Sequence, residues 1–191
     1  MNSNEAFVSG ASIFRYTEKA TLGPFETRKI DLPVGEVYQR DERFQAWRGH
    51  IINHSLFIEE RIDLIISKLF LKKDIERVEL FRAIILSREF FGFMNKWKVL
   101  KDLLTTIEPY KNNNYSSLYS NLHNLINERD KFAHGQVTYS GSKGEKIILE
   151  YFKEKLQKEE ITEKNVEDFL KLSFECRKGV DEILSEIRKN E

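Results

Sequence analysis

The stretch Asn127-Glu128-Arg129-Asp130-Lys131-Phe132-Ala133-His134-Gly135 reads as the end of an amphipathic helix. Upstream of it, apolar residues recur in steps of three and four, which is the spacing of one helical stripe: Leu118, Leu122, Leu125 and Phe132. Arg129 occupies a position on that stripe where a leucine would be expected. An arginine in a core or interface costs roughly 3–5 kcal/mol if it has no partner, so the stripe predicts an acidic partner for Arg129.

Gly135 marks the predicted end of this helix. Glycine is the residue most favoured just past a helix C-terminus, where left-handed backbone angles are needed, so His134 falls in the last turn. The helix end then holds a fixed cation, Arg129, and a titratable imidazole, His134. That combination suits work on a phosphate, because the cation neutralises negative charge and the imidazole exchanges protons near neutral pH.

The run of Arg129, Asp130, three further residues and His134, with its Ala-His-Gly ending, resembles the signature of the HEPN superfamily. Two earlier stretches are similar to the family as well: Ile58-Glu59 with Ile62-Asp63, and Phe93, Lys96, Leu100 and Leu103. The resemblance covers roughly residues 40–190. It implies a mainly α fold, an up-and-down helical bundle of HEPN type.

The same resemblance implies a function. Many members of the family are metal-independent endoribonucleases of toxin–antitoxin and anti-phage defence systems, whereas others have lost activity and only bind. The active members work as dimers with both Arg–His pairs near one cleft. The toxins that are paired with a nucleotidyltransferase carry a Tyr two residues after the His, where this chain has Gln136. The implied partners are RNA, a second copy of the chain, and an antitoxin or defence-system protein.

The composition limits the classes of partner. Lys plus Arg and Asp plus Glu both number 31, so the formal net charge is zero. A non-specific nucleic-acid coat would show a basic excess, so RNA binding must come from a local cluster. The one cysteine, Cys176, excludes an internal disulfide and a Cys-based zinc site. Neither a signal peptide nor an apolar run of about 20 residues is found, which predicts a cytoplasmic protein with no membrane partner.

The chain divides into two parts. Residues 1–37 contain Pro24, Pro33 and short strand-like runs, so we expect an extended N-terminal arm. A poorly ordered terminus is the alternative. Residues 38–191 have a mostly helical period and are expected to form a single HEPN-like helical domain.

The first long helical pattern begins near residue 42 and carries two adjacent apolar stripes, which is typical of a helix at the centre of a bundle. Glu59 and Asp63 interrupt the second stripe four residues apart, so they stack on one face. A buried carboxylate needs a cation. Arg129 is the predicted partner, because guanidinium and carboxylate pair in a bidentate fork; a surface pair with Arg61 or Lys68 is the alternative.

Further helices are predicted over residues 74–91, from Phe93 to about residue 109, and from Thr162 to the end. Trp97 in the middle helix is expected to be core, with a base-stacking surface as the alternative. His54 in the first helix is expected to be a hydrogen-bonded core or interface histidine. After Gly135 the pattern alternates around a Gly-rich turn, which predicts a β-hairpin.

No cofactor or metal is predicted, because the four histidines lie on different predicted faces and no phosphate-binding glycine loop is present. What remains is acid–base chemistry. RNA supplies its own nucleophile, the 2′-hydroxyl, so the predicted catalytic pair is His134 as acid or base and Arg129 as charge stabiliser. The predicted supporting residues are Asp130, Glu59 and Asn127, and the predicted RNA contacts are Lys96 and Lys131.

One histidine cannot serve as both acid and base in a single step, so a symmetric homodimer is expected to bring two copies of His134 to one cleft. The alternative is a catalytically inactive helical module that binds RNA, a nucleotide or a protein. The two interpretations differ at His134. Catalysis requires an accessible imidazole, whereas a purely structural role predicts a buried and fully hydrogen-bonded one.

Overall fold

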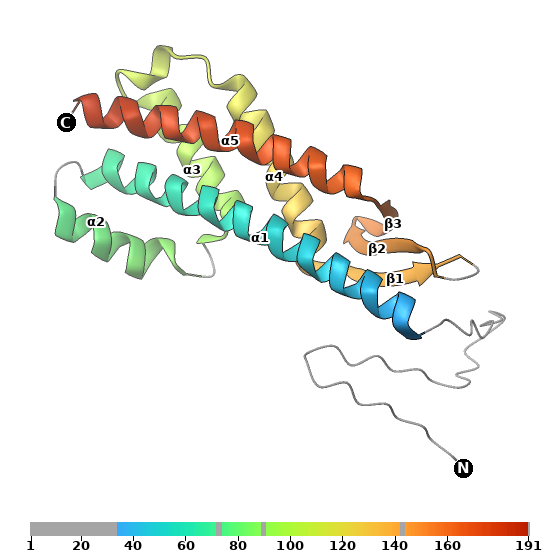
Figure 1. Ribbon diagram of the computed structural model, residues 1–191. Helices are drawn as coiled ribbons and strands as arrows, with labels where there is room; N and C mark the ends of the chain where they lie inside the picture. The colour runs from blue at the N-terminus through green and yellow to red at the C-terminus, as the bar shows by residue number, and fades with distance from the viewer. Residues whose placement is uncertain (1–33, 72–73, 89–90, 142–143, 191) are drawn as a thin grey trace. The chain divides into compact units, whose positions relative to one another are not determined.

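The computed structural model describes residues 34–71, 74–88, 91–141 and 144–190 (Figure 1). The fold is mainly helical, with a small antiparallel sheet, so the mainly α prediction is confirmed. The elements in chain order are α1 Val34–Leu71, α2 Ile75–Phe81, the π-helical turn η1 Arg82–Leu86, α3 Phe93–Thr106, the 3-10 turn η3 Tyr110–Asn112, α4 Ser116–His134, β1 Gln136–Ser140, β2 Lys146–Lys153, β3 Lys155–Ile161 and α5 Glu163–Asn190.

The helix α1 is the central support of this fold. Most of its predicted first stripe is buried, with five side chains at 0% exposure: Phe44, Ile51, Ile58, Ile62 and Ile65. In the same predicted stripe, Trp47 and Leu69 are partly exposed and His54 is exposed. The helix packs against α3, α4 and α5. It runs parallel to α5 (Figure 1), where Arg61 Nε lies 2.6 Å from Asp181 Oδ1. Of the interval predicted as an arm, residues 34–37 form the first turn of α1, and residues 1–33 lie outside the described residues.

The helix α4 runs opposite to α1. At its start, the Tyr115 hydroxyl lies 3.3 Å from Glu186 Oε2 near the end of α5. At its far end, the ring of Phe132 stacks on Phe44 near the beginning of α1, with 6.1 Å between centroids. The helices α4 and α5 are in close contact at Gly179, where a Cβ atom would lie 2.7 Å from Leu118 Cδ1. The predicted stripe of α4 is therefore buried between its neighbours.

The sheet joins the end of α4 to α5 in the order β1-β2-β3. The predicted hairpin is confirmed as β1 and β2, with Val137 opposite Leu149 and Tyr139 opposite Ile147. The third strand was not predicted. It follows β2 through the single residue Glu154, whose φ of 58° lies in the left-handed region.

Two other expectations need correction. The helix predicted over 74–91 is shorter, because α2 ends at Phe81 and the chain continues as the π-helical turn η1. His54 is exposed rather than core, with Nδ1 3.4 Å from Ser173 Oγ. Within the described part of the chain, no helix combines the length and apolarity needed to cross a bilayer.

Candidate functional site

The candidate site lies at the C-terminal end of α4, where His134 is the last helical residue. Its side chain is exposed. Among the residues that the structure describes, the imidazole has no hydrogen-bond or ion-pair partner. His134 thus has the accessibility that the catalytic interpretation requires, not the burial that a structural role predicts.

Gly135 caps this helix for a reason other than the predicted one. Its φ of −75° and ψ of 149° are extended, not left-handed. The constraint is space, because a Cβ atom at this position would lie 2.5 Å from the Lys131 carbonyl oxygen and 2.7 Å from Leu149 Cδ1. The absence of a side chain lets strand β2 approach the end of α4 directly behind His134.

Arg129 lies one and a half turns before His134 on α4, with 24% of its side chain exposed. Its Nη1 donates to Asp130 Oδ1 at 2.8 Å. Its Nε is buried and has no hydrogen-bond partner in the described part of the molecule. The predicted pairing of Arg129 with Glu59 is therefore wrong. The acidic partner is the adjacent Asp130, and the buried Nε is not accessible to an anion from solvent in this conformation.

Glu59 and Asp63 face α3 instead of α4. Lys96 Nζ donates to Glu59 Oε1 at 2.7 Å and to Asp63 Oδ2 at 2.9 Å. Lys96 is 5% exposed, so the prediction that it contacts RNA is wrong, and so is the supporting role predicted for Glu59. Sequence spacing identified a buried carboxylate pair that needs a cation. It could not show which neighbouring helix provides that cation.

The pKa values of Lys96 and Asp63 are both raised in this cluster. Burial alone would lower the pKa of Lys96, but the hydrogen bonds that it donates to both carboxylates, together with their negative charges, hold that pKa above its ordinary value. Burial raises the pKa of Asp63 despite the opposing effect of Lys96, and its Oδ1 has no hydrogen-bond partner among the described residues. The cluster of Glu59, Asp63 and Lys96 therefore stabilises the α1–α3 contact at some distance from His134.

Sequence analysis did not identify Arg48, on α1, which touches the end of the motif helix. Its Nη2 donates to the Gly135 carbonyl at 2.7 Å, and its guanidinium carbon lies 5.0 Å from the centroid of Phe44. Burial lowers the pKa of Arg48 against the opposing charge of Asp41. Asp41 itself is 8% exposed and accepts a hydrogen bond from the Tyr139 hydroxyl at 2.9 Å. The beginning of α1 therefore supports the residue that follows His134.

The remaining predicted residues have partners of their own. Lys131 Nζ lies 2.7 Å from Glu128 Oε1 and 3.2 Å from Glu159 Oε2, so its charge is engaged by two carboxylates. Asn127 Nδ2 lies 3.2 Å from His123 Nδ1 and supports that histidine instead of His134. Of the predicted set, Arg129, Asp130 and His134 lie in the last two turns of α4, where Arg129 pairs with Asp130 and no contact joins either of them to His134 among the described residues.

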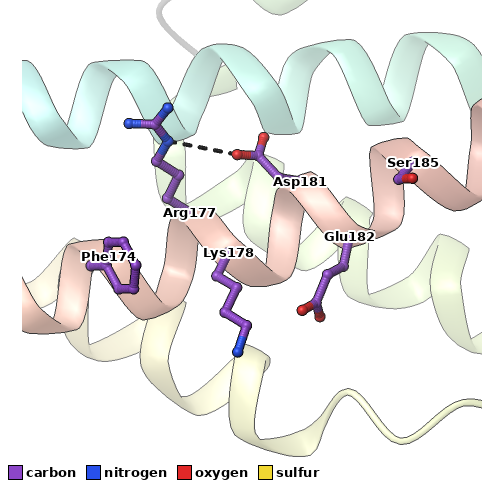
Figure 2. Close-up of a pocket in the computed structure, with 6 residues that line it drawn as sticks. All are labelled: Phe174, Arg177, Lys178, Asp181, Glu182 and Ser185. Atoms are coloured by element: carbon purple, nitrogen blue, oxygen red, sulfur yellow. Dashed lines mark ion pairs between the residues drawn. The ribbon is translucent and has the colours of Figure 1, made fainter.

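A hollow on the outer face of α5 is separate from this motif. Figure 2 shows its lining of Phe174, Arg177, Lys178, Asp181, Glu182 and Ser185. Arg177 Nε lies 3.6 Å from Asp181 Oδ2 there. The lining includes neither Arg129 nor His134.

The described residues contain no group of three or more His, Cys, Asp and Glu side chains arranged to hold a metal ion. Comparison with known proteins finds no matching family model, no similar curated protein and no similar solved structure. A function for this chain must therefore be argued from its own residues and from the motif that they form.

Proposed function

We propose that this chain is a metal-independent endoribonuclease of the toxin or anti-phage defence type, similar to active members of the HEPN superfamily. The observation that carries the proposal is the exposed His134 at the end of α4, which has no partner in the described ranges of the chain, with a half-buried Arg129 on the same helix. His134 can exchange a proton with solvent and substrate, and Arg129 retains a buried Nε without a partner among the described residues.

The chemistry requires little more than this pair. A base takes the proton of the RNA 2′-hydroxyl, whose oxygen then attacks the neighbouring phosphorus, and an acid protonates the leaving 5′-oxygen. A neutral imidazole can act as the base and an imidazolium as the acid. The guanidinium of Arg129 stabilises the charge that builds on the phosphoryl oxygens. The products are a 2′,3′-cyclic phosphate and a free 5′-hydroxyl.

A homodimer completes the site in this proposal. Each chain provides one His134, and a two-fold interface would place one as base and the other as acid. A cytoplasmic location and an antitoxin or defence-system partner belong to the same proposal.

The test is cleavage of single-stranded RNA in EDTA. We expect the wild type to cut RNA, and neither DNA nor 2′-O-methyl RNA, because both lack the nucleophile. His134→Ala and Arg129→Ala should each reduce the rate by about 10²-fold or more. His50→Ala removes an exposed histidine of α1 and is the matched control, with an unchanged rate. A folded wild-type dimer that cuts no RNA would refute the proposal.

An inactive binding module is the second candidate. It is favoured by one observation, namely that the cations nearest the motif are engaged: Lys131 by two carboxylates and Arg129 by Asp130. Binding of RNA without cleavage in the same assay would support it.

A further inference from the structure

One face of α4 leads from the middle of the helix to His134. Tyr119, His123 and Asn127 follow one another at steps of four, and His134 comes seven residues later. At about 100° per residue, a step of four advances about 40° and a step of seven turns back about 20°. These side chains therefore share one side of the helix. The first three are partly exposed and His134 is exposed.

The helix α3 adds two residues to this side of α4. Trp97 Nε1 donates to the Tyr119 carbonyl at 3.1 Å, and the rings of Trp97 and His123 lie 5.2 Å apart at 48°. Lys101 Nζ lies 5.7 Å from the Trp97 ring centroid and 6.0 Å from that of Tyr119. We call Trp97, Lys101, Tyr119, His123 and Asn127 the stacking face. Trp97 is thus neither fully core nor isolated on the surface.

The composition of this face matches unpaired nucleotides. Flat rings stack on bases of any sequence, and a cation held over the rings attracts the phosphate backbone. Asn127 offers an amide that can donate and accept hydrogen bonds. Asp130 places a carboxylate on this side of α4, and its charge is paired with Arg129 at 2.8 Å. Asp102 and Lys98 on α3 are both exposed and offset each other.

The face also has a useful length. From Tyr119 to His134, α4 rises about 22 Å at 1.5 Å per residue. At about 3.4 Å per nucleotide of a stacked strand, this distance accommodates about six nucleotides. A strand that stacks on Trp97, Tyr119 and His123 would therefore reach His134 without leaving the helix.

We propose that the stacking face binds single-stranded RNA beside the scissile phosphodiester, so that the substrate class is unpaired RNA. The inference rests on the proposed function for the position of cleavage. The preference for single-stranded over duplex RNA rests on the stacking face. Duplex RNA is excluded because its bases are stacked on one another and cannot reach the side-chain rings.

Tryptophan fluorescence provides the test, because the chain has two tryptophans and Trp47→Phe leaves Trp97 as the only reporter. A His134→Ala, Trp47→Phe protein is titrated with a single-stranded 2′-O-methyl oligoribonucleotide. We expect quenching that saturates. Adding His123→Ala or Lys101→Ala should weaken the affinity by roughly tenfold. Lys101 is exposed, so its variant is expected to fold even if His123→Ala does not.

Phe174→Ala is the control, because Phe174 is an aromatic side chain 65% exposed on α5 and outside the stacking face. Equal affinity of the Lys101→Ala and parent proteins, or equal competition by duplex RNA, would overturn the inference. If RNA binding depends on His123 and Lys101 but the wild-type protein cleaves no RNA, the proposed function is refuted and the stacking face is supported. If His123→Ala and Lys101→Ala leave the rate of RNA cleavage by His134-containing protein unchanged, the stacking face is refuted and the proposed function stands.

Discussion

At the scale of single residues, Gly135 and Lys96 show how close contacts determine what a position tolerates. Gly135 is required because helix α4 and strand β2 leave no space for a Cβ atom, although its backbone angles suit any residue. Lys96 is required because two buried carboxylates converge on its ammonium group. Neither requirement depends on the chemistry at His134, so each can be tested by stability alone.

Gly135→Ala should lower the free energy of unfolding by about 1–3 kcal/mol, the usual cost of forcing an extra methyl group into a packed site. Gly49→Ala is the control, because a Cβ atom there meets nothing within 4 Å on helix α1. That variant should gain up to about 1 kcal/mol from helix propensity. Urea unfolding measures both. Equal shifts in the two variants would contradict the contacts at Gly135.

Lys96→Met should lower the free energy of unfolding at pH 7 by about 3–5 kcal/mol, because it leaves Glu59 and Asp63 buried without a cation. Adding Glu59→Gln and Asp63→Asn should recover part of the loss. The pH dependence gives a second check. The pKa of Asp63 is already raised by burial, so its contribution favours folding at low pH and is lost as pH rises through that pKa. The deficit of Lys96→Met should therefore shrink between pH 7 and pH 4.

Cys176 is buried at 0% exposure, and burial raises its thiol pKa from 9.0 to about 12. The unfolded chain loses this proton near its ordinary value, so the contribution of Cys176 to stability falls as pH rises from 9 to about 12. Because the chain has one cysteine, the rate of reaction with a thiol reagent measures the accessibility of Cys176. We expect no reaction at pH 8 in buffer and full reaction in denaturant. Rapid modification of the native protein would contradict the burial.

At the scale of elements, the joint between α1, α4 and β1 is the structure on which the candidate site depends. Arg48 holds the Gly135 carbonyl and lies over Phe44, which in turn stacks on Phe132. About two turns before Arg48 on α1, Asp41 accepts a hydrogen bond from Tyr139 and joins the same two segments. His134 extends from this joint and owes its position to residues outside its motif.

Arg48→Ala should therefore lower both the stability of the protein and its rate of RNA cleavage. The Gly135 carbonyl would lose a half-buried donor at a cost of about 1–3 kcal/mol in unfolding free energy. Below the unfolding transition, kcat should fall at least tenfold as His134 loses its fixed position. Arg43→Ala, an exposed arginine on the same helix, is the control and should change neither quantity. An Arg48→Ala protein of wild-type activity would show that the joint does not position the catalytic group.

Sequence periodicity predicted the elements whose partners are apolar. The α4 stripe, most of the first α1 stripe and the β1–β2 hairpin follow from spacing, and the structure has them. The second predicted stripe of α1 is not buried as a whole, because Leu56 and Phe70 are exposed. Strand β3 was missed because Lys155-Leu156-Gln157-Lys158-Glu159-Glu160-Ile161 is mostly charged and polar. The turn before it places Glu154 in the left-handed region, which glycine usually occupies, so no glycine marks this turn in the sequence. The charge pairs could not be predicted either. Lys96 lies 37 residues after Glu59 and 33 after Asp63 in the sequence, and it meets them only because α3 packs against α1.

At the scale of the whole molecule, the equal numbers of acidic and basic residues should govern how RNA binding responds to salt. Most of the Lys and Arg side chains near Arg129 and His134 already pair with carboxylates, so we expect one or two contacts between the protein and RNA phosphates. The slope of log K against log salt concentration for single-stranded RNA should then be about −0.7 to −1.4. Titrations of His134→Ala between low and physiological salt measure it. A slope several times steeper would reveal a basic surface that the proposed site does not include.

The close approach of α5 to α4 at Gly179 also predicts which substitutions should occur together in related sequences. A methyl group at position 179 would strike Leu118 at 2.7 Å, so neither residue can enlarge while the other stays as it is. In lineages descended from this chain's ancestor, the two positions should drift as a pair: an alanine at 179 should accompany a smaller residue at 118. Such paired substitutions would preserve a record of this helix contact long after the surrounding sequence had diverged.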